Sequence, residues 1–346
     1  MTTTEEAPIR FITSVYGKKY GGMLLPLLYS IKTSHPAAHV SVFWDDINET
    51  TRLLERAFPD YEFVASRINA TGDVVNRIAE KASLWAYAAR RYPGENLVLL
   101  DSDMLVIRDI TNYFQLGFDI GFTYKDETYP INTGILLVRE SNESSQTFLD
   151  AWATRTVAIN SNSEEKRMAT NRSFPYGAPD QMAFYELVGF SLNKDQYAVQ
   201  INDGYPLIFR AIPCGELNET NSCPITDTTR VIHYKGGWHP ILLDGTGFTS
   251  HRPKADSWEM YLLYLATYNE AMRYVKTLLG LSRDRFFGIK RPFYIDADLK
   301  ESKPLYSIFQ VREHISRPLR ELFFRIARTM KNREVKRRQT LPVHPL

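Results

Sequence analysis

Two hydrophobic periods alternate along the first part of the chain. Short apolar runs of strand length are separated by longer stretches in which apolar residues recur every three or four positions, as on one face of a helix. The runs predict strands over residues 10–16, 39–44, 61–65 and 96–100. The clearest helical stretches are residues 24–31 and 73–91. A β-α-β-α-β-α-β order is typical of an α/β protein with a mainly parallel sheet covered by helices.

The pattern continues less regularly downstream. Residues 104–107 are expected to extend the fourth strand, and a polar stretch over residues 160–172 is predicted to be a loop. The remaining expected elements are strands at 118–124, 131–139 and 229–234, a helix at 146–158, a short helix opening at Asp180, and mainly helical structure after about residue 250. These elements divide the chain into a sheet-containing unit, residues 8–250, and a helical C-terminal extension, residues 251–346.

Charge is distributed unevenly. The 346 residues carry a formal net charge of +2, so nothing in the overall charge indicates a nucleic-acid partner. From Gln310 onward ten Lys or Arg and three Glu give a net +7, which leaves −5 for the rest. Residues 317–338 form a basic amphipathic pattern, typical of a helix lying on an anionic membrane surface. A helix packed on the protein body is the alternative.

The sequence predicts a cytoplasmic protein, and the basic tail adds the expectation of peripheral contact with a membrane surface. The N-terminus has no signal-peptide pattern, and no apolar run approaches the ~18 residues of a membrane span. Cys214 and Cys223 are too few to form a disulfide scaffold, and reduced thiols are favoured over a single short disulfide loop. Five Asn-x-Ser/Thr sites are therefore interpreted as incidental: Asn48, Asn69, Asn142, Asn171 and Asn218.

Candidate chemistry begins at Asp101-Ser102-Asp103, directly after the apolar run at 96–100. Ligands of α/β sheets bind where strands end. Two carboxylates at this spacing can face one divalent cation, and that cation can hold a phosphate. The motif is short, so its interpretation depends on which other motifs the chain contains.

Further motifs occur in a recognisable order around it. They are Lys81, Asn132-Thr133-Gly134, Asp180-Gln181 and the segment from His233 to Pro240. Together with the Asp-x-Asp motif they resemble glycosyltransferase family 8, retaining enzymes of the GT-A fold that use nucleotide sugars. The resemblance covers roughly residues 8–242.

The resemblance implies a UDP-sugar donor, most commonly UDP-glucose or UDP-galactose, and a glycan, lipid-linked or protein acceptor. It implies Mn²⁺, or Mg²⁺, as the cofactor, and mixed carboxylate and imidazole ligation suits Mn²⁺. The implied metal ligands are Asp101, Asp103 and His233. The implied donor-binding residues are Thr13, Ser14, Tyr16, Lys81, Ser102, Lys235, Gly236 and Gly237. The implied reaction-centre residues are Asn132, Asp180 and Gln181.

Several roles stay open at this level. Lys81 meets either the diphosphate or the first aspartate, and Tyr16 either stacks on the base or packs under a loop. Asp180 or Gln181 acts as a nucleophile or stabilises an oxocarbenium-like ion, unless Asp180 is only a helix N-cap. His239 stands where the family has a lysine, so either it or Lys235 would contact the phosphates.

Two other functions compete with the transferase. A phosphatase of the haloacid dehalogenase type also places Asp-x-Asp after a strand, but it requires Thr or Val where this chain has Leu105. A non-catalytic nucleotide-sugar or glycan binder is the second alternative, and the complete Asp, Asp and His set speaks against it.

Overall fold

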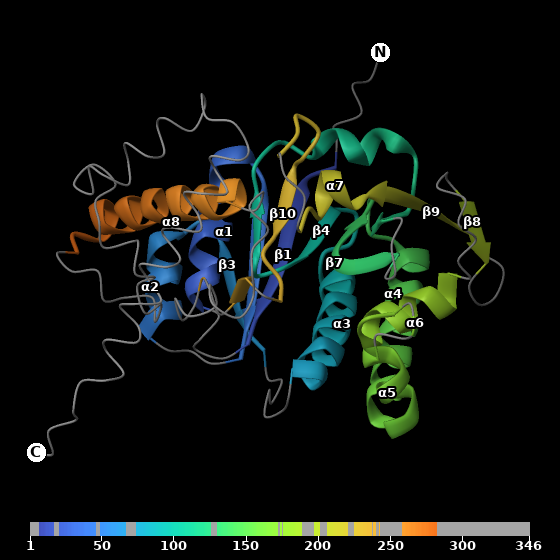
Figure 1. Ribbon diagram of the computed structural model, residues 1–346. Helices are drawn as coiled ribbons and strands as arrows, with labels where there is room; N and C mark the ends of the chain where they lie inside the picture. The colour runs from blue at the N-terminus through green and yellow to red at the C-terminus, as the bar shows by residue number, and fades with distance from the viewer. Residues whose placement is uncertain are drawn as a thin grey trace, which may run out of the picture.

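The computed structural model describes residues 7–16, 21–45, 49–66, 74–125, 130–171, 174, 176–188, 197–200, 206–220, 225–236, 238–239, 242 and 258–281. An eight-stranded sheet forms the centre, with strand order β3-β2-β1-β4-β7-β6-β9-β8. Helices cover both of its faces (Figure 1). The α/β class expected from the sequence is confirmed.

The first half of the sheet is parallel and agrees with the predicted strands. It contains β1 (Ile9–Val15), β2 (His39–Trp44), β3 (Glu62–Ala65) and β4 (Asn96–Asp101). All five residues of β4 before Asp101 are buried, because both faces of this central strand are covered. In the register of β1 and β4, Ser14 lies beside Asp101.

The second half is mixed. β7 (Ile131–Val138) runs antiparallel to both β4 and β6 (Ile120–Tyr124), and β9 (Pro206–Pro213) runs parallel to β6. β8 (Tyr197–Gln200) completes this edge, antiparallel to β9. Strands at 118–124 and 131–139 were expected with nearly these bounds, whereas β8 and β9 were not predicted.

The residues after Asp103 do not extend the fourth strand, contrary to the prediction. The chain turns at Ser102 and Asp103, and β5 (Met104–Val106) leaves the main sheet. β5 pairs antiparallel with β10 (Val231–His233), which lies within the expected 229–234 strand. This two-stranded sheet positions His233, as described below.

Helices divide between the two faces of the main sheet (Figure 1). One group comprises α1 (Gly21–Ser34), α2 (Glu49–Ala57) and α8 (Trp258–Leu279). The other comprises α3 (Val74–Arg91), α4 (Glu143–Ser161), α5 (Ser163–Thr170) and α6 (Pro179–Val188). Each group has its own apolar core, one containing Leu27 and Tyr264 and the other containing Trp85 and Trp152. Short helical turns η1 (Thr111–Leu116) and α7 (Cys214–Leu217) connect strands.

The predicted loop at 160–172 was wrong for nearly all of its length. α4 continues to Ser161, and α5 follows after Asn162. The Asn162 side chain accepts hydrogen bonds from the backbone N–H groups of Glu164 and Glu165, so it caps α5. The cap and the acidic first turn explain why a polar sequence is helical here.

The C-terminal extension is described only in part. α8 starts after the expected boundary near residue 250 and packs against α1 and α2, and the boundary itself stays a prediction. The basic segment 317–338 lies outside the described residues. In the described part of the chain, no helix combines the length and the apolar character needed to cross a membrane.

His35 directly follows α1 and forms a pH-sensitive contact. Its Nε2 accepts a hydrogen bond from the backbone N–H of Ile110 (3.0 Å), which requires an unprotonated nitrogen. Burial lowers the pKa of His35, and the exposed Asp109 carboxylate opposes that shift only partly.

We therefore expect the free energy of unfolding to fall as the pH is lowered from about 7 towards 5, because the unfolded chain protonates its histidine near about 6.5 while the fold favours the neutral ring. Chemical denaturation across this range should show that the free energy of unfolding of His35→Gln depends less steeply on pH than that of the wild type. His39→Gln, at an exposed histidine, is the control. Equal pH dependence in wild type and His35→Gln would contradict the assignment.

Candidate functional site

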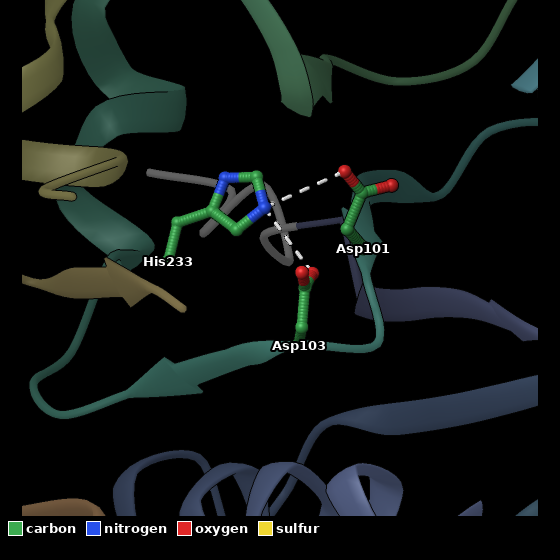
Figure 2. A group of neighbouring side chains, drawn as sticks. All are labelled: Asp101, Asp103 and His233. Atoms are coloured by element: carbon green, nitrogen blue, oxygen red, sulfur yellow. Dashed lines mark ion pairs between the residues drawn. The ribbon is translucent and has the colours of Figure 1, made fainter. Parts of the chain in front are cut away.

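Asp101, Asp103 and His233 meet at the end of β4. Nε2 of His233 lies 3.2 Å from Oδ1 of Asp103 and 3.7 Å from Oδ2 of Asp101 (Figure 2). One ligand atom from each residue lies within 4.8 Å of the other two. Metal–oxygen distances of about 2.0–2.6 Å place ligands of one ion at most about 5 Å apart. Two carboxylates and an imidazole therefore fit a single divalent cation such as Mn²⁺.

The small β5–β10 sheet is what brings His233 to the two acids. Its register places His233 opposite Met104, the residue directly after Asp103. The backbone N–H of Tyr234 donates to the carbonyl oxygen of Asp103 (2.8 Å), which fixes the turn against β10. Because these contacts are made by the backbone, the convergence depends on the fold and not on side-chain flexibility.

The two aspartates have different electrostatic surroundings. Burial alone would raise the pKa of Asp103, but His233 and His239 outweigh it and hold that pKa well below its usual range. The pKa of Asp101 is raised by burial and by the neighbouring Asp103, against the influence of Lys81. A divalent cation between them would favour the ionised form of both.

Lys81 is buried and links this site to α6. Its Nζ lies 3.1 Å from Oδ1 of Asp101 and 3.0 Å from Oδ2 of Asp180, and it donates to the carbonyl oxygen of Thr133 (3.3 Å). Burial alone would lower the pKa of Lys81, but the two carboxylates more than offset it and raise it. Of the two roles left open by the sequence, the structure shows contact with the first aspartate.

Asp180 lies in the first turn of α6 and points to Lys81, so it is not the N-cap. Its Oδ2 also accepts a hydrogen bond from the hydroxyl of Thr133 (2.6 Å). Trp152 donates to its backbone carbonyl oxygen (2.8 Å). Oδ1 is buried and has no hydrogen-bond partner within the described residues. The neighbouring Gln181 is half-buried.

Asn132 and Gly134 lie two positions apart on β7 and have distinct roles. The backbone N–H of Gly134 donates to Oδ1 of the buried Asn132 (2.9 Å). A Cβ atom on Gly134 would lie 2.6 Å from Cε1 and 2.8 Å from Nδ1 of His233. The glycine is therefore required by the close approach of the imidazole to β7.

The expected nucleoside-binding residues lie at the end of β1, beside Asp101. Thr13 and Ser14 are buried, and Ser102 is half-buried in the turn after β4. Tyr16 is 8% exposed, and burial raises its pKa. The Oγ1 of Thr13 is buried without a hydrogen-bond partner among the described residues.

The segment after β10 returns to the site through His239. Its Nε2 lies 2.5 Å from Oδ2 of Asp103, whereas His233 lies near Oδ1 of the same carboxylate. Lys235 is half-buried, and its pKa is lowered by burial and by Lys125. Gly236 adopts a left-handed conformation (φ 61°), and Gly237 lies outside the described residues.

Sequence reasoning missed one residue of this site. Asn218 was noted only as part of an Asn-x-Thr site, yet it is fully buried, and its Oδ1 lies 2.8 Å from Nδ1 of His233. The sequence signal that could have drawn attention to it, a polar residue between the apolar β9 and β10 segments, is weak.

Comparisons with known proteins give distant structural likeness. The sequence matches no protein-family model and no curated protein. Among similar solved structures is the glycosyltransferase GlyE of Streptococcus pneumoniae TIGR4, at 11% identity and a TM-score of 0.47, covering 80% of this chain and 63% of GlyE. This chain thus spans slightly less than two thirds of GlyE.

Two further structures are similar in the same way. The galactosyltransferase LgtC, in complex with donor and acceptor sugar analogues, shows 13% identity and a TM-score of 0.44, covering 75% of this chain and 95% of LgtC. A glycosyltransferase involved in glycosylation of the major capsid of PBCV-1 shows 16% identity and a TM-score of 0.42. The match covers 66% of this chain and 94% of the PBCV-1 glycosyltransferase.

The Gly134 contact predicts a steric route to disabling the metal site. Gly134→Ala should displace the His233 ring and weaken Mn²⁺ binding by at least about tenfold, comparable to the loss of an outer support of a ligand. Isothermal titration calorimetry with Mn²⁺ measures this. Gly121→Ala on the neighbouring β6 is the matched control, because its Cβ would meet apolar side chains at 3.2 Å. Unchanged affinity in Gly134→Ala would contradict the geometry.

The Lys81 contacts predict a large loss of stability. Lys81→Met should reduce the free energy of unfolding by about 3–5 kcal/mol, because the buried Asp180 loses its cationic partner. Denaturant titration of Lys81→Met and Lys81→Met/Asp180→Asn separates this cause from lost packing. The double variant should recover part of the loss, since one uncompensated charge is removed. A double variant less stable than Lys81→Met would argue against charge pairing as the cause.

Proposed function

We propose that this protein is a metal-dependent GT-A glycosyltransferase that transfers a hexose from a UDP-sugar with retention of configuration. The observation that supports it most is the convergence of Asp101, Asp103 and His233 at the end of β4. Ligands of α/β sheets bind at such strand ends. A sugar nucleotide needs its departing diphosphate neutralised, and a metal held here would supply that Lewis-acid function.

The chain's own charges support a diphosphate next to the metal. Lys81 balances Asp101 and Asp180, so the acidic groups of the site are partly compensated without a ligand. Lys235 and Lys125 add positive charge on the side of the β10 segment. Gly236 permits a backbone turn that can direct N–H groups towards phosphate oxygens. We assign Lys235 and Gly236 to donor binding.

The nucleoside would lie at the end of β1. The strand end that carries Asp101 has four candidate binding residues at or beside it: Thr13, Ser14, Tyr16 and Ser102. The hydroxyl of Thr13, which has no hydrogen-bond partner among the described residues, would supply a donor and an acceptor for a ligand. In this proposal the uridine would lie on one side of the metal and the sugar on the other.

The sugar would lie towards β7 and α6, near Asn132, Asp180 and Gln181. Retention requires a group on the face opposite the leaving diphosphate, acting either as a nucleophile or as a stabiliser of an oxocarbenium-like ion. Asp180 supports the second role, because Lys81 and Thr133 hold its Oδ2 while Oδ1 has no described partner. Its carboxylate is fixed, as electrostatic stabilisation requires.

A glycan, a lipid-linked sugar or a protein fits a transferase of this type. Peripheral membrane contact through residues 317–338 would suit a lipid-linked or surface acceptor.

Metal-dependent release of UDP tests the proposed function. Purified protein is incubated with UDP-glucose or UDP-galactose and Mn²⁺, Mg²⁺ or EDTA, and released UDP is measured. We expect release with a metal, and at least a hundredfold decrease in Asp103→Asn, which removes a ligand charge with little change in shape. Asp150→Asn, at a half-exposed aspartate on α4, is the control.

Other outcomes identify the alternatives. Full release by Asp103→Asn would refute the metal site. Binding of UDP-sugars by the wild type without release of UDP would indicate a non-catalytic binder. Hydrolysis of phosphomonoesters instead would indicate the phosphatase.

A further inference from the structure

A buried chain of hydrogen bonds connects His233 to β6 and β7. Nδ1 of His233 lies 2.8 Å from Oδ1 of Asn218. Nδ2 of Asn218 lies 2.8 Å from Oγ1 of Thr123, and that hydroxyl lies 2.7 Å from the carbonyl oxygen of Asn132. All four residues are at most 6% exposed. Water therefore does not compete for these contacts.

The direction of each bond follows from the groups involved. The carbonyl oxygen of Asn132 can only accept, so it receives the single hydroxyl hydrogen of Thr123. Oγ1 of Thr123 must then accept from Asn218, which turns the NH₂ of the amide towards Thr123 and its Oδ1 towards the imidazole. Oδ1 can only accept, so Nδ1 of His233 carries the hydrogen.

The half-buried thiol of Cys214, beside Thr123, does not change the direction of these hydrogen bonds. Cys214 also forms a hydrogen bond with Thr123, and burial raises the pKa of this thiol to about 11. The thiol therefore keeps its proton at neutral pH. It can donate to Oγ1 without taking the hydroxyl hydrogen.

The consequence appears at the other ring nitrogen. With the hydrogen on Nδ1, the neutral ring has its lone pair on Nε2, the atom that faces Asp103 and Asp101 at 3.2 and 3.7 Å. A lone pair directed at two carboxylates is unfavourable alone and favourable with a cation between them. The opposite tautomer would place a hydrogen where the ion must lie.

We propose that Asn218 and Thr123 are positioning residues that fix the Nδ1-protonated tautomer of His233 and so prepare Nε2 as a ligand for a divalent cation. The proposal rests on the metal site of the proposed function. Outer partners of metal-binding histidines act in this way, by setting the tautomer and orientation of the ring. The Asn-x-Thr site at Asn218 thereby has a structural role, and its side-chain nitrogen is buried and already bonded.

The tautomer can be measured in the metal-free wild type. Long-range ¹H–¹⁵N NMR of ¹⁵N-histidine-labelled protein, at a pH where the ring is neutral, distinguishes protonated from unprotonated ring nitrogens. The spectrum of His233→Gln identifies the resonances. We expect protonated Nδ1 and unprotonated Nε2. Protonated Nε2, or rapid exchange between both tautomers, would overturn the proposal.

Metal affinity tests the role of the Thr123 hydroxyl, which sets the direction of the hydrogen bonds. Thr123→Val keeps the shape but removes the hydroxyl, so the Asn218 amide is no longer oriented. We expect Mn²⁺ affinity, measured by calorimetry, to fall by about 10–100-fold in Thr123→Val. Thr123→Ser, which restores a hydroxyl, should stay within about threefold of wild type.

Thr156→Val is the matched control for stability. Thr156 is fully buried, and its hydroxyl donates to the carbonyl oxygen of Trp152 at 2.7 Å, the same bond type and length as that of Thr123. Both valine variants should lower the melting temperature to a similar extent, but only Thr123→Val should lower metal affinity. Equal affinity in wild type and Thr123→Val, or equal losses in both valine variants, would overturn the proposal.

Failure of the two proposals would be distinguishable. Mn²⁺ binding by a wild type with the opposite tautomer would overturn the positioning role and leave the proposed function standing. A wild type with the expected tautomer that binds no divalent cation would refute the metal site itself.

Discussion

The site depends on the balance of buried charge at the end of β4. Three carboxylates, those of Asp101, Asp103 and Asp180, approach one another where the dielectric is low, and their repulsion must be compensated for the fold to persist. Lys81 compensates from one side by touching Asp101 and Asp180. His233 and His239 surround Asp103 on the other side, each near a different carboxylate oxygen. Asp103 is consequently held as an anion, and Asp101 lies between Lys81 and the candidate metal position. A divalent cation bound there would complete the charge balance.

Backbone geometry explains why these charges can be brought so close. The turn after β4 sends β5 out of the main sheet, where it pairs with β10 and places His233 beside the two acids. On the opposite side, β7 approaches the imidazole at Gly134, a position where no side chain fits. The ring is thus confined by the backbone of β7, and Asn218, which is itself bonded to Thr123, contacts Nδ1 of the ring. Rigid support of this kind is what a precise ligand geometry requires.

Much of the fold could be predicted because local pattern and tertiary role agree. β4 contains a continuous apolar run, β1 and β2 are short segments rich in apolar residues, and α3 has a clear apolar face. The period and length of these apolar patterns were therefore enough to predict the elements. Prediction failed where the decisive signal was a single polar group. At α5 the cap at Asn162 outweighs a polar, weakly periodic sequence. β5 was joined to β4 because hydrophobicity alone does not show that a two-residue turn redirects the chain.

For the site, the sequence by itself determined the candidate residues and their order: two acids after an apolar run, a lysine on the helix before them, an Asn-Thr-Gly strand and a distant histidine. Those features are local, since each depends on neighbours within a few residues. Only the tertiary structure decided which of them touch, that Lys81 joins Asp101 to Asp180, and that His239 faces Asp103. It alone revealed the contact of Asn218 with His233. The direction of that hydrogen bond is set by Thr123 and Asn132, which lie on strands distant in the sequence. No local pattern encodes a proton position that depends on contacts between segments far apart in the chain.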